Sequence, residues 1–519
     1  MPATDGMMRV LVRSSRALVP VVLALAVGCP RAAGAATCTP RVPTFLGNSR
    51  RCFHGTGPVP TRLDVIWKVR LGSGKTWVGG GFKPWSGNGW TGQPLIVEED
   101  GTPFIIVGAY DHHLRKINGL TGEVIWKYRF DDVIKGTGTL YSNPSARSPE
   151  EQLIILQGSR RGNSKTLASE HVFSYRAISY ATGRELWRMN VPRTGSYSRD
   201  VDGSALALGG LAYLGAENGI FYVLDPDPAQ ATVRDGALQP KILKQRRLYS
   251  EDDAARHGGD LAIESSPALC GDRIIVTAGS GHVFGMDPET LEIAWDFFIG
   301  SDLNGSPVVT RDGCVLVTVE KQFISGRGGV FKLDPQKPPN AEAVWWYFPV
   351  GDRRFATWQG GVVGSASVND SYNPRGRKPC LAAFSAVAGR LYVVSHISRA
   401  SETVRGPRSE GPYRTPREIF SANIGGAIST PVFCGDDTRD WVVAAGYNGV
   451  YLFQLDYLPA RPDDPEALWS PDGRLWRVKV TQLDHFAPGI SFEATPVVWK
   501  GMVYVGARDG WLYALGDQR

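Results

Sequence analysis

A short unit of four apolar stretches recurs along this chain, and such a repeat constrains the fold more than any other feature of the sequence. The clearest copy occupies residues 264–269, 274–277, 281–287 and 291–295. Its stretches carry alternating or β-branched apolar residues, and Gly, Asp or Pro separates them, as is typical of short strands joined by tight turns. The unit is therefore predicted to be one antiparallel blade of four strands.

The unit occurs eight times in all, which predicts an all-β, eight-bladed β-propeller of four-stranded antiparallel blades. The copies begin near residues 94, 144, 202, 264, 304, 364, 429 and 494. The last copy lacks its fourth strand, whereas an unmatched strand, residues 64–69, precedes the first copy. Because free sheet edges invite unwanted pairing, we expect residues 66–69 to pair with the C-terminal blade and close the ring. Residues 1–60 are then expected to lie outside the propeller.

The N-terminus predicts export. Basic residues Arg9, Arg13 and Arg16 precede an apolar run at 17–27 and then small residues, the pattern of a signal peptide cut after Ala35. We therefore predict a signal peptide at 1–35, an N-terminal extension at 36–63 and the propeller at 64–519, in a periplasmic or secreted protein. The apolar run is too short for a transmembrane span. A lipid anchor on Cys29 is the less favoured alternative.

Charge and cysteines add two expectations. Removal of residues 1–35 would lower the formal net charge from +6 to +3, which is weak and evenly spread and argues against a nucleic-acid partner or an acidic membrane. Removal of the leader leaves an even number of cysteines, which permits up to three disulfides in an oxidising compartment. They are Cys38, Cys52, Cys270, Cys314, Cys380 and Cys434. We predict that Cys38 pairs with Cys52.

Links between consecutive blades lie on the face where the central channel opens, so they supply candidate site residues. At the same place in each link stand Thr91, Tyr141, Asp202, Glu264, Asn304, Val363, Ile428 and Glu493. Oxygen-bearing side chains from consecutive blades are the ligands that Ca²⁺ prefers, so Asp202, Glu264 and Asn304 are candidate metal ligands, with Glu493 at the same mouth. The alternative is that these side chains cap strand ends or bond to neighbouring blades.

Four tryptophans are expected at the same mouth. Trp77, Trp85 and Trp90 lie in a Gly-rich stretch at 72–92, and Trp358 precedes another link. Exposed aromatic side chains on a loop favour contact with a ligand or partner. The stretch could instead fold over the channel as a plug.

The repeat is similar to that of quinoprotein-dehydrogenase-like propellers, with a Ser/Thr-Pro start, a Gly-x-Leu-Tyr-Ala-Leu-like third strand and a Thr-Gly-x-x-x-Trp finish over roughly residues 64–517. In that family the repeated Trp packs between blades. The matching residues here are Trp67, Trp126, Trp187, Trp295, Trp346 and Trp476. The resemblance implies pyrroloquinoline quinone and calcium in the channel. However, the sequence has no adjacent cysteine pair and no C-x-x-C-H haem motif.

Two functions follow from these observations. The first is a non-catalytic scaffold that binds a protein partner in the cell envelope or outside the cell, similar to the propeller of outer-membrane β-barrel assembly. The alternative is a quinone- and calcium-dependent dehydrogenase of alcohols or sugars, which uses the acids at the channel mouth. A polar, open channel favours the dehydrogenase, whereas a channel filled by apolar side chains such as Val363 and Ile428 favours the scaffold.

Overall fold

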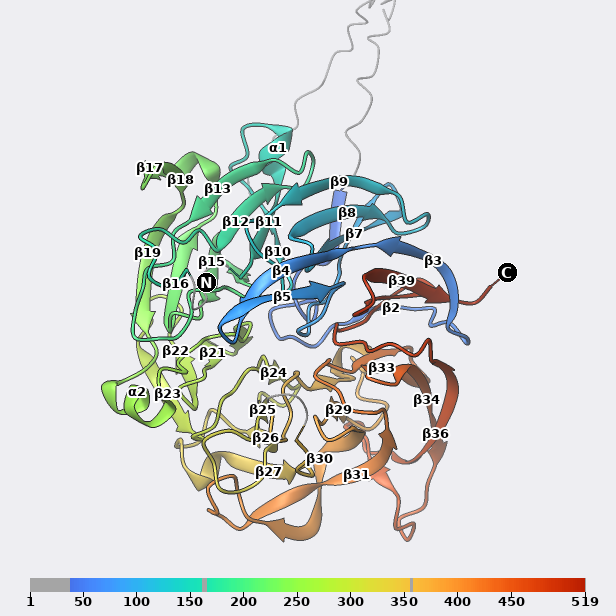
Figure 1. Cartoon of the computed structure of the whole chain (residues 1–519). Helices are drawn as coiled ribbons and strands as arrows, with labels where there is room; N and C mark the ends of the chain where they lie inside the picture. Colours follow the sequence, from blue (N-terminus) through green and yellow to red (C-terminus); the bar gives the residue numbers. More distant parts are fainter. Residues whose placement is uncertain (1–37, 161–165, 355–357, 519) are drawn as a thin grey trace, which may run out of the picture. The chain divides into compact units, whose positions relative to one another are not determined.

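Eight antiparallel sheets make up the propeller. The computed structural model describes residues 38–160, 166–354 and 358–518, and residues 38–519 form one compact unit. The predicted signal peptide and Cys29 lie outside the described residues. Figure 1 shows the sheets arranged in a ring, in the order of the sequence. The predicted eight-bladed β-propeller is confirmed.

Blades 1 to 7 take their four strands in sequence order, with the first nearest the centre, and blade 8 takes its outer strand from the start of the propeller. Blade 1 comprises β6 (Leu95–Glu99), β7 (Thr102–Gly108), β8 (His113–Asn118) and β9 (Val124–Arg129). Blade 2 comprises β10 (Thr139–Ser142), β11 (Leu153–Gly158), β12 (Tyr175–Ser179) and β13 (Glu185–Met189). Blade 3 comprises β14 (Leu206–Leu208), β15 (Leu211–Gly215), β16 (Ile220–Asp225) and β19 (Lys241–Arg247). Blade 4 comprises β20 (Ala268–Cys270), β21 (Arg273–Thr277), β22 (His282–Met286) and β23 (Ile293–Phe298).

The second half of the ring follows the same plan. Blade 5 comprises β24 (Val308–Val309), β25 (Val315–Val319), β26 (Gly329–Leu333) and β27 (Val344–Pro349). Blade 6 comprises β28 (Ser367–Val368), β29 (Leu381–Ser385), β30 (Arg390–Val404) and β31 (Tyr413–Asn423). Blade 7 comprises β32 (Val432–Gly435), β33 (Arg439–Gly446), β34 (Gly449–Pro459) and β36 (Leu475–Phe486), with the short β35 (Leu468–Trp469) beyond β36. Blade 8 comprises β37 (Val497–Trp499), β38 (Met502–Gly506), β39 (Trp511–Gly516) and β3 (Asp64–Arg70).

Segments inserted between the blade strands form two extra hairpins and several short helices. Two hairpins stand outside the blades, β4 (Ser73–Val78) with β5 (Gly81–Ser86) and β17 (Thr232–Arg234) with β18 (Ala237–Gln239). The helices are short: α1 (Pro149–Gln152), α2 (Glu251–His257), η1 (Pro228–Gln230), η2 (Ala341–Ala343) and η3 (Asp370–Tyr372). Among the described residues, no helix has the length and apolar character needed to cross a bilayer.

The ring closes where the two ends of the propeller meet. The N-terminal strand β3 pairs antiparallel with β39, from Asp64 opposite Gly516 to Arg70 opposite Trp511. Figure 1 shows the blue β3 beside the red β39. The predicted closure by residues 66–69 is therefore confirmed, and β3 supplies the fourth strand that the C-terminal part of blade 8 lacks.

Tryptophan side chains join neighbouring blades. Five outer-strand indoles donate an Nε1–H bond to a carbonyl of the next blade: Trp67 to Gly119, Trp126 to Tyr180, Trp187 to Pro226, Trp295 to Lys337 and Trp346 to His396. Trp476 instead donates to Ser470 of its own blade. The predicted inter-blade packing holds for the first five, which bury a large apolar area and satisfy their only polar atom.

The glycine of the repeat makes room for these rings. A Cβ on Gly183 would lie 2.7 Å from the Trp126 ring, and Gly183 has a left-handed φ of +71°. In blade 4, Leu291 stands at the position before Trp295 that Gly183 has before Trp187. Its backbone is also left-handed, with a φ of 61°. The preceding blade 3 has no tryptophan in its outer strand, so the buried Leu291 side chain occupies space that a ring fills elsewhere. Tryptophan and the next blade's glycine therefore form one packing unit.

Residues 38–56 run around the centre of the ring, which corrects the prediction that they lie outside it. The strand β1 (Cys38–Val42) pairs with β6 of blade 1, and β2 (Gly55–Thr56) pairs parallel with β37 of blade 8. Between them the segment contacts blades 2 to 7 in order, through Pro43 to Leu140, Thr44 to Ala205, Ser49 to Leu269, Arg50 to Val309, Cys52 to Ser371 and His54 to Phe433. We call residues 38–56 the central lap.

The lap also explains why the predicted Cys38–Cys52 disulfide is wrong. All six cysteines in the described part of the chain are free thiols. Cys38 lies opposite Glu99 in blade 1, whereas the Sγ atom of Cys52 lies 3.3 Å from Ser371 of blade 6. The two thiols are close in sequence but belong to different parts of the ring.

We expect Gly183→Ala to lower the free energy of unfolding by about 3 kcal/mol, because the added methyl group meets both the left-handed backbone and the Trp126 ring. Gly209→Ala is the matched control, since Gly209 has a φ of +60° and an added Cβ there would have no atom within 4 Å. It should cost about 1 kcal/mol. Urea unfolding measures both variants, and equal losses would contradict a role for the ring contact.

Candidate functional site

The predicted channel-mouth positions converge at the ring axis. Asp202, Glu264, Asn304 and Val363 line a small enclosed void of about 30 Å³, closed on the lap side by Phe45. This volume holds one or two waters. Blade 2 contributes Gly136 to this wall, whereas Tyr141 lies within β10 and donates to the carbonyl of Gly210. The inner strand of blade 2 begins before Pro144, so the predicted register for that link is wrong.

A larger cavity of about 840 Å³ opens above this void. Aromatic and charged side chains line it together: Trp85, Trp90, Lys135, Arg160, Tyr197, Asp260, Glu264, Asp302, Asn304, Glu320, Lys321, Phe323 and Trp358. Three of the four predicted tryptophans therefore lie at one opening. The fourth, Trp77, packs edge-on against Phe82 in the β4–β5 hairpin, with ring centroids 5.2 Å apart.

Three carboxylates, two buried and one partly exposed, meet beside the opening. Oxygen atoms of Asp202, Glu217 and Glu264 lie within 4.8 Å of one another, close enough to hold one cation. The ammonium of Lys135 forms an ion pair with Asp202, and its Nζ atom lies 3.4 Å from Glu217. Burial alone would lower the pKa of Lys135, but attraction to these acids outweighs burial and raises it. The chain thus places its own cation beside the acids.

The contacts of Lys135 and Asn304 show whether the predicted calcium ligands are available to a metal ion. Because the Lys135 ammonium is paired with Asp202, a calcium ion at the three acids would have to displace it. The side-chain amide of Asn304 donates to Asp302 at 3.0 Å and to Glu320 at 3.1 Å. Asn304 therefore serves a neighbouring acidic group. The residues present do not fit a calcium ion held jointly by Asp202, Glu264 and Asn304.

That neighbouring group contains Asp260, Asp302 and Glu320. Burial, reinforced by Glu264 and Glu217, raises the pKa of Asp260 to about 7. Burial also raises the pKa of Glu320 to about 8, and it raises the pKa of Asp302 well above its ordinary value. Carboxyl groups of this kind take up protons near neutral pH, which is the property of a general acid or base.

Trp90 divides the mouth into a polar and an apolar half. Its Nε1–H donates to Glu264 at 2.9 Å, and its ring lies 5.6 Å from that of Trp358 and 4.7 Å from the Lys135 ammonium. On the other side, Val363, Val387 and Ile428 form a buried apolar cluster against both tryptophans. The channel is thus filled by apolar groups over blades 6 and 7 and lined by acids over blades 3 to 5.

This arrangement also limits where a flat cofactor could lie. The chain's own groups contact the Trp90 ring, and the void at the axis has about 30 Å³. A tricyclic quinone does not fit in this void, whereas the outer cavity of about 840 Å³ has the volume for one. Glu493, the remaining predicted acid, is held by Arg508 at 2.6 Å and by the Tyr447 hydroxyl at 2.7 Å. It links parts of the fold and lines neither the void nor the outer cavity.

Sequence reasoning missed Lys135, Glu217, Asp260, Asp302 and Glu320. Two of them stood near predicted positions, since Asp302 lies two residues before Asn304 and Asp260 four before Glu264. Lys135 directly precedes Gly136, so the correct register for blade 2 would have identified it. Glu217 and Glu320 follow second strands of their blades, and only the folded ring brings them to the mouth.

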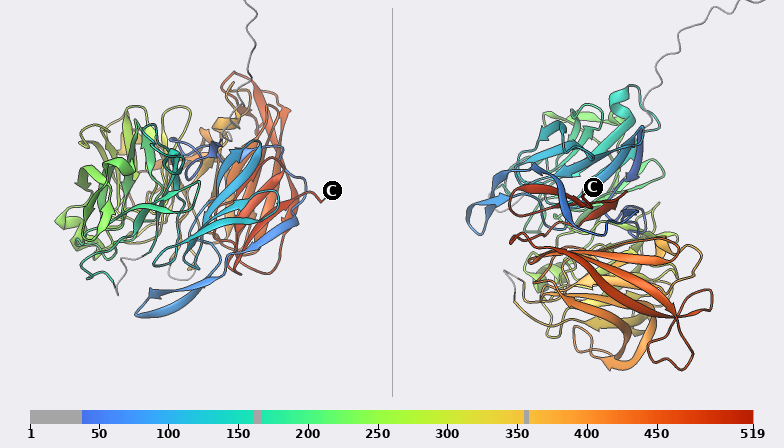
Figure 2. Two further views of the ribbon diagram at one scale, coloured as in Figure 1. Left: turned by 90° about the horizontal axis from the view of Figure 1, so that it is seen from above. Right: turned by 90° about the vertical axis from the view of Figure 1, so that its right-hand side faces the viewer.

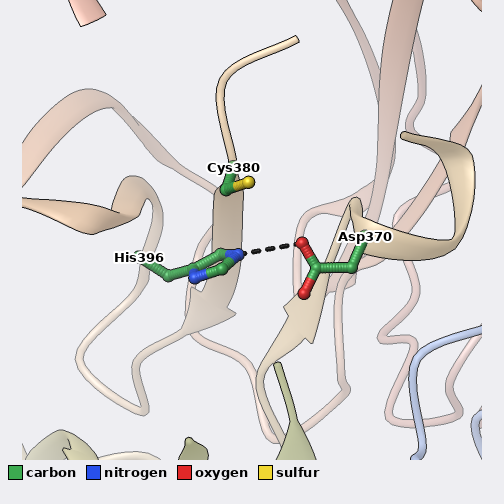
Figure 3. Close-up of side chains that lie close together, drawn as sticks. All are labelled: Asp370, Cys380 and His396. Atoms are coloured by element: carbon green, nitrogen blue, oxygen red, sulfur yellow. Dashed lines mark hydrogen bonds and ion pairs between the residues drawn. The ribbon is translucent and has the colours of Figure 1, made fainter. Parts of the chain in front are cut away.

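A second group of metal-type ligands lies at the boundary of blades 5 and 6. Figure 3 shows Asp370, Cys380 and His396 pointing toward one another, and all three are buried. His396 Nε2 lies 3.0 Å from Asp370, whereas Nδ1 faces the Lys332 ammonium at 3.5 Å. An ammonium facing Nδ1 favours a proton on Nε2, which then donates to Asp370. Burial raises the pKa of the Cys380 thiol to about 12. The cluster is therefore a closed polar network that joins two blades.

The raised pKa values at the mouth predict a pH dependence. A carboxyl whose pKa is higher in the folded than in the unfolded state binds extra protons when folded, so its contribution to stability falls as pH rises. Between pH 5 and about 7, the Asp260 carboxyl should lower the free energy of unfolding by about 1.4 kcal/mol for each unit that the pH rises. Asp260→Asn should flatten this decline in urea unfolding, whereas Asp463→Asn, on an exposed loop, should not. The same slope in all three proteins would contradict the assignment.

Comparisons with known proteins agree with the architecture. The family model described as outer membrane protein assembly factor BamB matches residues 175–336. No curated protein matches the sequence. The quinohemoprotein alcohol dehydrogenase of Comamonas testosteroni superposes with a TM-score of 0.53 at 13% identity, covering 92% of this chain and 81% of that one.

Two further solved structures are similar. A europium-containing methanol dehydrogenase has a TM-score of 0.52 at 12% identity and covers 91% of each chain. BamB from Moraxella catarrhalis has a TM-score of 0.48 at 12% identity, covering 88% of this chain and 100% of that one. At such low identity the two dehydrogenases show a shared fold and not a shared activity. The repeat, the eight blades and the family match over residues 175–336 make the chain similar to β-propellers built from pyrroloquinoline-quinone-like repeats.

Proposed function

We propose that this chain is an exported, non-catalytic propeller that binds a protein partner with the face at which the channel opens. The observation that carries the proposal is the β4–β5 hairpin, whose two strands pair only with each other. In the left view of Figure 2 this blue hairpin stands out from the ring. An isolated two-stranded hairpin is only marginally stable in water, so a projecting one suits contact with another surface.

The hairpin is held along β4 and presents an aromatic side chain near its turn. The Lys75 carbonyl lies 3.2 Å from His112 Nε2, and the Trp77 carbonyl accepts a bond from Arg160 at 3.2 Å. Near the turn, Phe82 is 56% exposed beside Trp77. A large aromatic side chain held at a defined place is the kind of residue that dominates binding energy at protein interfaces.

The state of the mouth supports a binding role over redox chemistry. Lys135 forms an ion pair with Asp202, one of the acids that a catalytic calcium would need, and apolar side chains pack against Trp90 and Trp358 on one side of the opening. The family match to an outer-membrane assembly factor is consistent with a partner in the cell envelope. Export itself is part of the proposal and rests on the signal-peptide pattern at 1–35.

The second candidate is the quinone- and calcium-dependent dehydrogenase; its calcium does not fit Asp202, Glu264 and Asn304, but one observation favours its acid–base chemistry. Asp260 and Glu320 face the outer cavity with pKa values of about 7 and about 8, as a general base for alcohol oxidation requires. When bound there, the quinone would accept the substrate's electrons. The chain's own contribution would be to hold the alcohol and accept its hydroxyl proton on a carboxylate.

Phe82→Ser tests the proposed interface. We expect the wild-type protein to retain one envelope protein from an extract of its source organism, and the affinity for that purified partner to fall at least tenfold in the variant (about 1.4 kcal/mol). Trp469→Ser is the matched control, because Trp469 is 59% exposed on β35 of blade 7, outside the hairpin. Equal binding by wild type and both variants would contradict an interface at the hairpin.

A further inference from the structure

A second concave surface lies on the outer wall of the ring, away from the channel. It is a groove of about 710 Å³ to which three consecutive blades contribute. Phe298 comes from blade 4, Trp345 from blade 5, and Arg399, Arg408 and Arg414 from the long β30–β31 hairpin of blade 6. This hairpin is the orange ribbon at the bottom of Figure 1, below β27.

The three arginines are ordered by aromatic rings and carbonyls. The Arg399 guanidinium lies 4.2 Å from the centre of the Trp345 ring. Arg408 lies 4.9 Å from the Phe298 ring and donates to the Phe298 carbonyl, and Arg414 donates to the Ser401 carbonyl at 2.6 Å. A guanidinium has five N–H donors, so each side chain is held in place and still has donors to offer.

The acidic side chains that line the groove form hydrogen bonds with groups other than the three guanidinium groups. Asp296 lies 2.6 Å from His282 Nδ1, and Glu410 accepts from the backbone N–H of Arg408 at 2.7 Å. Within the described part of the chain, none of the three arginines has a salt bridge to a carboxylate. The groove therefore combines three arginines that form no ion pair with a described residue, two carboxylates and an aromatic wall, including Trp345 at 37% exposed, and its lining carries a net positive charge.

We propose that this groove binds an acidic peptide segment of a protein partner, with Asp or Glu carboxylates on Arg399, Arg408 and Arg414. Clusters of arginine recognise acidic motifs through paired N–H bonds to each carboxylate. Side chains already ordered by stacking lose less entropy on binding. A concave groove bounded by three blades suits a narrow chain better than the broad surface of an anionic membrane. The site is independent of the channel-mouth interface.

Fluorescence anisotropy with a labelled hexaglutamate peptide tests the site on the full-length protein. We expect saturable binding that weakens with added salt, and no binding of the matching hexaglutamine peptide. Arg399→Gln combined with Arg414→Gln should weaken binding at least tenfold. Arg390→Gln combined with Arg405→Gln is the control, because it removes the same charge from the same hairpin at residues outside the groove lining. It should change binding less than twofold.

Several results would overturn the proposal. They are the absence of saturable peptide binding, an equal loss in the control variant, full displacement of the peptide by free glutamate, and a preference for anionic vesicles that the Arg399 and Arg414 changes abolish. Circular dichroism checks that each variant is folded. Phe82→Ser should leave peptide binding unchanged, so failure of this site and failure of the channel-mouth interface are distinguishable.

Discussion

The fit of one blade's tryptophan onto the next blade's backbone organises this molecule. A single four-stranded blade is too thin to bury its own faces, so each must pack against a neighbour. Trp126 shows how, since its ring lies over Gly183 and its indole N–H binds the Tyr180 carbonyl. Repetition of this contact fixes the angle between blades, and the pairing of β3 with β39 turns the array into a ring. The channel mouth exists because the ring is closed.

The central lap determines what kind of channel the ring encloses. Because residues 38–56 contact every blade in turn, one end of the channel is sealed by the chain itself. The buried Arg51 side chain holds the lap there, donating to Thr44, to the Phe45 carbonyl and to the Pro267 carbonyl of blade 4. What remains is a blind cavity at the other end, with Lys135 among its acids and a projecting hairpin at its edge. Such a cavity suits binding at a surface better than passage through the ring.

The sequence predicted the repeating parts well because each copy reports the same contacts. The spacing of Thr121-Gly122 and Trp126 recurs in other blades and indicates the contact between a tryptophan and the glycine of the next blade. The missing last strand indicated ring closure. The lap has no repeating pattern, because its path depends on backbone and side-chain contacts with eight separate blades. Lys135 was missed because the inner strand of blade 2 begins before Pro144. The site is thus less predictable than the fold, because its residues come from links of unequal length.

Calcium titration by calorimetry, with and without pyrroloquinoline quinone, tests most directly whether Lys135 replaces a metal at the channel mouth. The wild-type protein should show no saturable heat. Lys135→Met should leave Asp202, Glu217 and Glu264 unneutralised, lower stability and gain calcium binding in about the 10⁻⁴ M range, with calcium restoring the lost stability. Saturable binding to the wild type that disappears in Glu264→Gln would contradict this view and favour the dehydrogenase.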